Sequence, residues 1–390
     1  METKYTQHPQ EIISGLRTDI LRILYYMSLA MLILRHYRNP LKSLKILKEL
    51  TRHRREFSGE KIKKMVRVDG KYYWDLYVPG YKSKANDNYI LGEANRILPI
   101  HEKTNRFINI LFAITKRCHL KCEHCFEWDS LNDKETLTLP DINNIVAKFQ
   151  EKGTAQIQIT GGEPLLMVDE IVQILDASKP GTDFWIFTSG HHLTPENAMK
   201  LKQAGLTGVV VSLDHFDPAL HNQFRGSNKS FEWAQAAVKN AIGAKLVTAL
   251  SICLSRSFVT ESNLMAFIEL ASKMGVSFIQ ILEPKAVGHF SGKDVLLKAE
   301  HEKILEDFYL KMTSDKKFRK YPILCYHGYY QRKVGCFGHG NRSLYIDTDG
   351  DLHACPFCRT KMGNALSGDL DDKIEQLKNA GCHQYETACF

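Results

Sequence analysis

The chain has 390 residues, of which 44% are hydrophobic and 25% are charged, a composition typical of a globular protein. This composition excludes wholesale disorder, collagen-like repetition and a membrane protein with several spans. The formal net charge is +8, and residues 1–64 account for all of it, with 14 Lys and Arg against 6 Asp and Glu. A nucleic-acid enzyme would carry its basic surface around its active site, so we expect no nucleic-acid partner.

Residues 1–64 are expected to form a basic extension of two amphipathic helices. The longest apolar run, residues 23–34, would be roughly 18 Å long as a helix, shorter than the ~30 Å hydrocarbon core of a membrane. No signal-peptide cleavage site follows it, so we expect a cytoplasmic protein. The helices either pack on the rest of the chain or on a second subunit, or they make a peripheral contact with the inner face of the membrane. The apolar positions at helical spacing are Ile20, Ile23, Leu24, Met27, Met31, Leu34, Leu41, Leu44 and Leu47.

Residues 65–106 are expected to form a hairpin followed by a linker. Val66 to Val78 is predicted to contain two strands around Asp69-Gly70, because Asp-Gly supplies the positive φ angles of a tight primed turn. Residues 79–104 show no clear period, so an irregular linker is expected there.

Residues 107–315 alternate between short apolar runs and longer helical patterns. Strands are expected at 107–115, 156–162, 184–190, 208–214, 246–255 and 278–284, and helices at 139–152, 168–178, 195–204, 231–241, 262–274 and 299–312. Six such units imply parallel strands and predict an α/β fold, a partial (β/α)6 TIM-like barrel. Residues 320–390 lose the alternation and are expected to form a small cysteine-rich domain.

Ten cysteines in a cytoplasmic chain indicate metal or cluster ligation rather than disulfides. Cys118, Cys122 and Cys125 follow the first barrel strand, where such folds place their chemistry. At this spacing three thiolates can hold three irons of a [4Fe-4S] cube. With His119 or His124 they could instead hold zinc.

The second barrel strand runs into Gly161-Gly162-Glu163-Pro164. The two glycines expose backbone to a ligand, Glu163 offers a carboxylate, and Pro164 fixes the exit into the next helix. A three-cysteine loop followed by this turn resembles the radical S-adenosylmethionine (SAM) superfamily, whose signature is CxxxCxxC and a GGEP-like turn on a partial (β/α)6 barrel. The resemblance covers residues 107–315 and favours the cluster over zinc.

The resemblance implies that Cys118, Cys122 and Cys125 bind a [4Fe-4S] cluster, whose open iron is chelated by the amino and carboxylate groups of SAM. One electron, from a donor such as flavodoxin or ferredoxin, would cleave SAM to methionine and a 5′-deoxyadenosyl radical that takes hydrogen from the substrate. The turn at residues 161–164 would hold the SAM amino group, and Phe126 would pack against the adenine. His124 departs from the family pattern, which more often has an aromatic residue before the third cysteine.

Polar residues at the other strand ends are further candidates for contacts with SAM or the substrate. Ser212 and Asp214 share one face of their strand by the period of two, and Ser189 follows the third strand. A polar strand cap or a small core residue is the alternative for each. The same alternatives hold for Thr188, Ser251, Cys253 and Glu283.

The C-terminal cysteines form a second group. Thirteen residues separate Cys336 from Gly350 and four separate Gly350 from Cys355, around a hairpin expected at Asp349-Gly350. This spacing resembles the opening of the SPASM and Twitch auxiliary-cluster domains, which implies at least one auxiliary [4Fe-4S] cluster. Structural zinc is the alternative. The preferred ligands are Cys336, Cys355, Cys358 and Cys382, with Cys389 or Cys325 as the substitute.

The sequence therefore predicts a radical SAM enzyme of the oxidoreductase or maturase type, with peptide or protein modification as the leading function. Its N-terminal helices precede the hairpin, which is the wrong order for the winged-helix domain that many peptide maturases carry. Two alternatives stay open. One is radical modification of a lipid or small molecule at the membrane surface, and the other is a non-catalytic zinc-binding scaffold.

Overall fold

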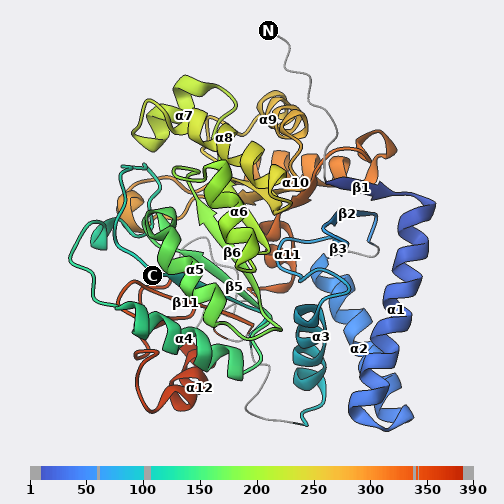
Figure 1. Cartoon of the computed structure of the whole chain (residues 1–390). Coiled ribbons are helices and arrows are strands. Elements are labelled where there is room, and N and C mark those ends of the chain that lie inside the picture. Colours follow the sequence, from blue (N-terminus) through green and yellow to red (C-terminus); the bar gives the residue numbers. More distant parts are fainter. Residues whose placement is uncertain (1–9, 59–61, 101–106, 337–339, 341, 381–390) are drawn as a thin grey trace.

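A nine-stranded sheet dominates the computed structural model, which describes residues 10–58, 62–100, 107–336, 340 and 342–380 (Figure 1). The strand order is β10-β9-β8-β7-β6-β5-β4-β11-β12, with β10 at Ile323–Cys325, β11 at Ser343–Ile346 and β12 at Leu352–His353. Every pair from β10 to β11 is parallel. The six central strands are β4 (Asn109–Ala113), β5 (Gln156–Thr160), β6 (Asp183–Thr188), β7 (Gly208–Ser212), β8 (Val247–Cys253) and β9 (Phe278–Leu282). They confirm the predicted partial (β/α)6 barrel.

Helices cover the outer face of this sheet, as the alternation predicts. Several of them begin at residues that cap their free N–H groups; Thr138 forms a capping box with Asp141, and Thr194 and Thr260 cap later helices. The helices are α4 (Leu139–Glu151), α5 (Val168–Ala177), α6 (Pro195–Gln203), α7 (Pro218–Arg225), α8 (Ser230–Gly243), α9 (Glu261–Met274) and α10 (Ala299–Ser314), with short 3-10 turns η1 (Trp128–Ser130), η2 (Pro164–Met167), η3 (Gly288–Phe290) and η4 (Lys316–Phe318).

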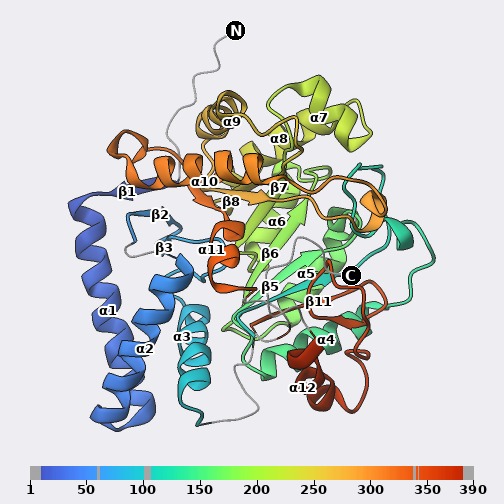
Figure 2. The ribbon, with the colours of Figure 1, turned by 180° about the vertical axis from the view of Figure 1, so that it is seen from behind.

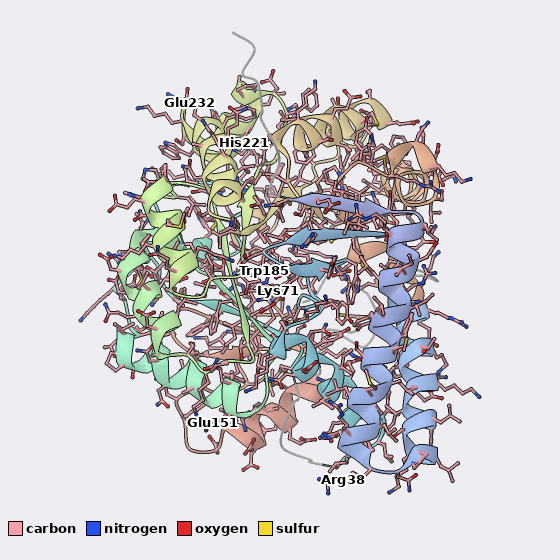
Figure 3. All side chains as sticks on the ribbon, turned by 45° about the vertical axis from the view of Figure 1, so that its right-hand side comes forward. Arg38, Lys71, Glu151, Trp185, His221 and Glu232 are labelled. Atoms are coloured by element: carbon pink, nitrogen blue, oxygen red, sulfur yellow. The ribbon has the colours of Figure 1, made fainter. Side chains whose placement is uncertain are left out.

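The inner face of the barrel is closed at the amino ends of its strands by the predicted hairpin. Strands β2 (Lys64–Val68) and β3 (Lys71–Tyr73) turn at Asp69-Gly70, where both φ angles are positive. Their apolar side chains share one buried cluster with inward side chains of the barrel, near Trp185 and Lys71 in Figure 3. The cluster includes Val66, Val68, Tyr73, Leu76, Trp185, Val210, Ala249 and Phe278.

The N-terminal residues form one unit with the hairpin. Strand β1 (Glu11–Ser14) pairs antiparallel with β2, and between them run the two predicted helices, α1 (Leu16–Tyr37) and α2 (Pro40–Ser58). On α1 the residues that face α2 and the helix α3 (Lys84–Ile97) are Tyr25, Leu29, Ile33 and Tyr37. No helix of the described residues is long and apolar enough to cross a membrane.

The prediction of an irregular linker at residues 79–104 is wrong. Most of it is helix α3 (Lys84–Ile97), which begins at the capping residue Ser83 and packs against α1 and α2. Its buried positions include Asn86 and Glu93, so no apolar stripe marks the helix in the sequence.

The cysteine-rich C-terminal region continues the barrel sheet on both sides. Strand β10 (Ile323–Cys325) pairs with β9, and α11 (His327–Val334) then lies beside α2 (Figure 2). The predicted hairpin is confirmed as β11 (Ser343–Ile346) and β12 (Leu352–His353), and β11 pairs in parallel with β4. Helix α12 (Leu370–Ala380) ends the described chain.

Candidate active site

A cavity of about 540 Å³ opens at the carboxyl ends of the barrel strands. It is lined from three parts of the chain, namely the barrel loops, the N-terminal helices and the C-terminal region. Pro164 and Cys358 do not line it, and Cys382 and Cys389 lie outside the described residues. The predicted site residues that line it are Cys118, Cys122, Cys125, Phe126, Gly161, Gly162, Glu163, Thr188, Ser189, Ser212, Asp214, Ser251, Cys253, Glu283, Cys336 and Cys355.

The loop that carries the three cysteines is held by backbone contacts. The Cys118 amide donates to Asn132 Oδ1 at 2.9 Å, and the amides of Lys121 and Glu123 donate to the carbonyls of Arg225 and Phe224. Cys122 is 8% exposed, and the three cysteines of the loop are free thiols. These contacts hold the loop in place, and its three thiols line one cavity.

The glycines of the turn after β5 let the cysteine loop approach closely. The amide of Gly162 donates to Thr115 O at 2.7 Å and that of Glu163 to Arg117 O at 2.8 Å. A Cβ on Gly162 would stand 2.2 Å from Arg117 O, and one on Gly161 would stand 2.5 Å from Thr115 O. Both positions therefore require glycine whatever ligand is bound.

The carboxylate of Glu163 is buried and ties this turn to the end of β6. It accepts hydrogen bonds from Thr188 Oγ1 at 2.7 Å, from the Ser189 amide at 2.8 Å and from the Leu165 amide at 3.0 Å. Burial raises the pKa of Glu163 overall, although these donors oppose that effect. The predicted polar residues Glu163 and Ser189 thus hold each other in place beside the cavity.

Arg225, at the end of α7, is a site residue that the sequence analysis missed. Its Nη1 lies 3.6 Å from Cys122 Sγ, and its Nε lies 2.6 Å from Asp214 Oδ2. The other oxygen of Asp214 accepts the Cys253 amide at 2.9 Å. Asp214, predicted as a ligand contact, is therefore already paired, and Arg225 puts a positive charge beside a cysteine thiol.

Aromatic side chains surround the cysteines. Phe126, predicted to pack on a ligand, has its ring edge-to-face with Tyr345 and Phe357, at 5.8 and 6.4 Å between ring centroids. His124 stacks on Phe224 at 4.8 Å, and burial lowers its pKa to about 4. His124 is thus a neutral aromatic ring, which explains why histidine can stand at that position.

The three thiols are chemically suited to bind an iron–sulfur cluster. They are soft, reduced ligands that share one cavity, and burial raises the pKa of Cys118 and of Cys125 to about 12. Thiols with such a pKa lose their protons to solvent when they coordinate a metal centre, because coordination lowers the pKa of the bound sulfur. Within the described residues, no three His, Cys, Asp or Glu side chains already form a finished metal site.

The described C-terminal cysteines divide into two sets. Cys336 and Cys355 line the same cavity as the barrel cysteines, and the Cys358 amide donates to Cys355 O at 3.1 Å. Cys325 instead packs in the apolar cluster under the hairpin, so it does not meet the cavity. Of the predicted auxiliary ligands, Cys336 and Cys355 therefore share the cavity with the barrel cysteines.

Comparisons with known proteins agree with this geometry. The Radical SAM superfamily profile matches residues 112–271. The chain is 28% identical over 272 residues to mycofactocin maturase MftC of Mycolicibacterium smegmatis, covering 67% of this chain and 68% of the relative. It is 26% identical over 306 residues to GTP 3',8-cyclase of Photorhabdus laumondii, covering 72% of this chain and 91% of the relative.

Solved structures share the fold. Streptococcus suis SuiB bound to precursor peptide SuiA matches with a TM-score of 0.57 at 14% identity, covering 75% of this chain and 71% of SuiB. SuiB bound to S-adenosylmethionine matches with a TM-score of 0.54 at 16% identity, covering 78% and 74%. The cysteine loop and the glycine turn lie together at the carboxyl ends of a partial barrel, and the family profile spans both. Residues 112–271 therefore form a radical SAM domain.

Proposed function

We propose that this protein removes a hydrogen atom from a substrate by radical SAM chemistry. The observation that carries the proposal is that Cys118, Cys122 and Cys125 line one cavity with the Gly161–Glu163 turn. The three thiols would hold a [4Fe-4S] cluster, and with SAM bound this cluster would supply the radical chemistry.

The chain's own residues would position these groups. The turn at residues 161–163, fixed by the Glu163 hydrogen bonds, would receive the SAM amino group, and Phe126 would pack on the adenine. Ser189 and Ser212 line the cavity beyond the turn and would contact the rest of SAM. Arg225 would stabilise the Cys122 thiolate electrostatically.

The relatives favour a peptide or protein as the substrate class. MftC is named as a maturase, and SuiB has been solved with its precursor peptide. The cavity continues past the barrel to Tyr26, His53 and Trp74 of the N-terminal unit, which leaves room for a substrate beside SAM. A cytoplasmic donor such as flavodoxin or ferredoxin would provide the electron.

An auxiliary [4Fe-4S] cluster would complete the electron path. Cys336 and Cys355 line the cavity that holds the radical site, with Cys358 near Cys355. Cys382 would be the fourth ligand. Thiolates at this end of the cavity would hold the second cluster where it can accept an electron from the substrate.

Modification of a lipid or lipid-linked small molecule is the second candidate. One observation favours it. The outer face of α1 is apolar, and Tyr25 and Leu29 on the opposite, inner face of the same helix line the cavity. This candidate shares the radical chemistry and differs in the substrate alone.

Anaerobic purification, reconstitution and metal counting test the proposal, followed by incubation with SAM and dithionite. We expect about eight irons per chain from two clusters, and 5′-deoxyadenosine as product. The Cys118→Ala/Cys122→Ala/Cys125→Ala variant should lose 5′-deoxyadenosine and about half of its iron.

Two further variants separate the clusters. Cys336→Ala/Cys355→Ala should lose the other half of the iron, whereas the control Cys325→Ala should keep all of it, because Cys325 packs in an apolar cluster. Zinc in place of iron would support a non-catalytic zinc scaffold instead, and no 5′-deoxyadenosine from fully loaded protein would contradict the radical chemistry.

A further inference from the structure

The outer face of α1 and the first turn of α2 expose an unusual number of large apolar side chains. In the described part of the chain, fourteen large apolar residues are exposed, and nine of them lie on these two helices. Single exposed apolar residues are ordinary, but a contiguous apolar surface marks an interaction site. The nine are Leu16, Ile20, Ile23, Leu24, Met27, Met31, Leu34, Leu41 and Leu44, each 45–81% exposed.

Helix α1 is apolar on two opposite sides. Tyr25 and Leu29 are buried against the other N-terminal helices. Met27 lies two residues after Tyr25, and Met31 lies two residues after Leu29. Two residues correspond to about 200° around a helix of 3.6 residues per turn, so the second apolar face points directly away from the core. Figure 3 brings this side of the molecule forward. The outer face is therefore not needed for packing of the fold.

Basic side chains border this face where α1 meets α2. The basic side chains at this corner are all exposed. In the part of the chain that the structure describes, none of them forms an ion pair with an acidic residue. Arg38, with a positive φ, forms the C-cap of α1 at this corner (Figure 3). The acidic residues of the two helices are few, and Asp19 and Glu49 are already paired with Arg22 and Arg52. The basic residues at the corner are Arg35, Arg38, Lys42, Lys45 and Lys48.

We infer that the outer face of α1, with the basic corner at the start of α2, docks on an anionic lipid surface. An apolar stripe bordered by unpaired cations is the pattern of a helix that lies in a membrane interface, where the stripe enters the acyl boundary and the cations meet lipid headgroups. A second copy of the chain fits poorly. Residues 16–58 carry ten Lys and Arg against three Asp and Glu, so any self-contact brings two positive surfaces together.

The docked orientation has a consequence for the active site. Because the inner residues of α1 line the cavity, the cavity begins about one helix diameter, ~10 Å, from the docked surface. A membrane-held substrate could thus reach the cavity past α1 and α2. This consequence rests on the proposed function, whereas the docking itself does not, so the two can fail separately.

Co-sedimentation of the full-length protein with vesicles tests the docking without any activity measurement. We expect binding to phosphatidylcholine vesicles that contain phosphatidylglycerol, and much weaker binding to phosphatidylcholine alone. Met27→Glu/Met31→Glu should reduce binding at least tenfold. Lys42→Gln/Lys45→Gln should reduce it by about fivefold per residue on anionic vesicles, as expected when each cation contributes ~1 kcal/mol.

Met199→Glu/Leu220→Glu is the matched control, because it places the same charges on exposed apolar residues of α6 and α7, away from α1 (Figure 1). It should bind vesicles as the wild type does. Light scattering after size exclusion should give the same mass for wild type and Met27→Glu/Met31→Glu. A dimer that this variant dissociates would overturn the inference in favour of a second copy, and equal binding to neutral vesicles or no binding at all would also overturn it.

Discussion

Arg225 joins two parts of the site that are far apart in sequence, the cysteine loop and the end of β7. Its side chain is 9% exposed and that of Asp214 is 3% exposed, so the ion pair is shielded from water. Removing one partner of a buried pair leaves an uncompensated charge, which costs about 3–5 kcal/mol. We therefore expect Arg225→Met to lower the free energy of unfolding of the cluster-free protein by about that amount, measured in urea.

Arg256→Met is the control for this prediction. Arg256 also pairs with a carboxylate, but its partner Asp294 is 81% exposed, and exposed pairs contribute at most ~1 kcal/mol. Equal losses for the two variants would mean that the Asp214 pair is not buried in solution.

Gly162 tests whether the turn supports the cysteine loop by close backbone contact. A Cβ at this position would stand 2.2 Å from Arg117 O and 3.0 Å from Cys118 Cβ, so Gly162→Ala must displace the loop. We expect this variant to retain less than half of the iron at the barrel cluster after reconstitution. Gly243→Ala is the control, because a Cβ there meets nothing within 4 Å; similar iron in both variants would contradict the close contact.

At the scale of elements, the β11–β12 hairpin depends on a buried carboxylate in its turn. Asp347 Oδ1 accepts the amides of Asp349 and Asp351 at 2.9 Å each, and His353 Nε2 lies 2.8 Å from Asp347 Oδ2. Burial alone would raise the pKa of Asp347, but the His353 contact and the two amides lower it overall. This hairpin pairs with β4 and is followed closely by Cys355, so its stability bears on the second cysteine group.

A lowered carboxyl pKa makes stability depend on pH in a defined direction. The contribution of Asp347 is fully present above its unfolded pKa of about 3.9, and it is lost as the pH falls through the lower folded value. Asp347→Asn should therefore lower the free energy of unfolding at pH 7 by about 1.5–3 kcal/mol, and its difference from wild type should shrink below about pH 4.

Urea unfolding of cluster-free protein across this pH range checks the prediction. Asp176→Asn, which changes an exposed carboxyl, should differ little from wild type at any pH. A deficit of Asp347→Asn that stays constant down to pH 3 would show that the carboxylate charge is not what stabilises the turn.

The barrel elements were predictable from sequence because short, largely apolar strands alternate regularly with longer helical segments. Helix α3 was not, since buried Asn86 and Glu93 interrupt its apolar period. The two apolar faces of α1 both follow the helical period, and the sequence cannot say which one meets the core. The pairing of β11 with β4 joins residues more than 200 positions apart, which no local pattern indicates.

In the site, sequence spacing was sufficient to predict those groups whose residues are close together in the sequence. The cysteine loop, the turn at residues 161–164 and the cavity-facing Ser212 were found in this way. Arg225 and the N-terminal lining were not, because they reach the cavity only through the tertiary fold. Local reasoning also gave the glycines a ligand-binding role, whereas their first requirement is room for the cysteine loop.

At the scale of the whole molecule, the N-terminal unit and the barrel share one core rather than meeting at a surface. Val66 and Val68 of the hairpin lie in one apolar cluster with Trp185 and Phe278 of the barrel. Polar contacts cross the same boundary, since Gln156 Nε2 donates to Leu76 O at 3.1 Å. Elements that share a buried core are expected to unfold together.

Hydrogen exchange measured by mass spectrometry distinguishes shared from separate unfolding. Val66→Ala, which opens a cavity in the shared cluster, should raise exchange in β2 and equally in the barrel strands β6 to β9. Ile46→Ala removes a similar buried volume from the cluster of α1, α2 and α3, which includes no barrel residue, so its effect should stay within those helices. If Val66→Ala raised exchange in β1 to β3 alone, the hairpin would be an independent cap on the barrel, and a movement of the N-terminal helices could then open the cavity without disturbing the cysteine loop.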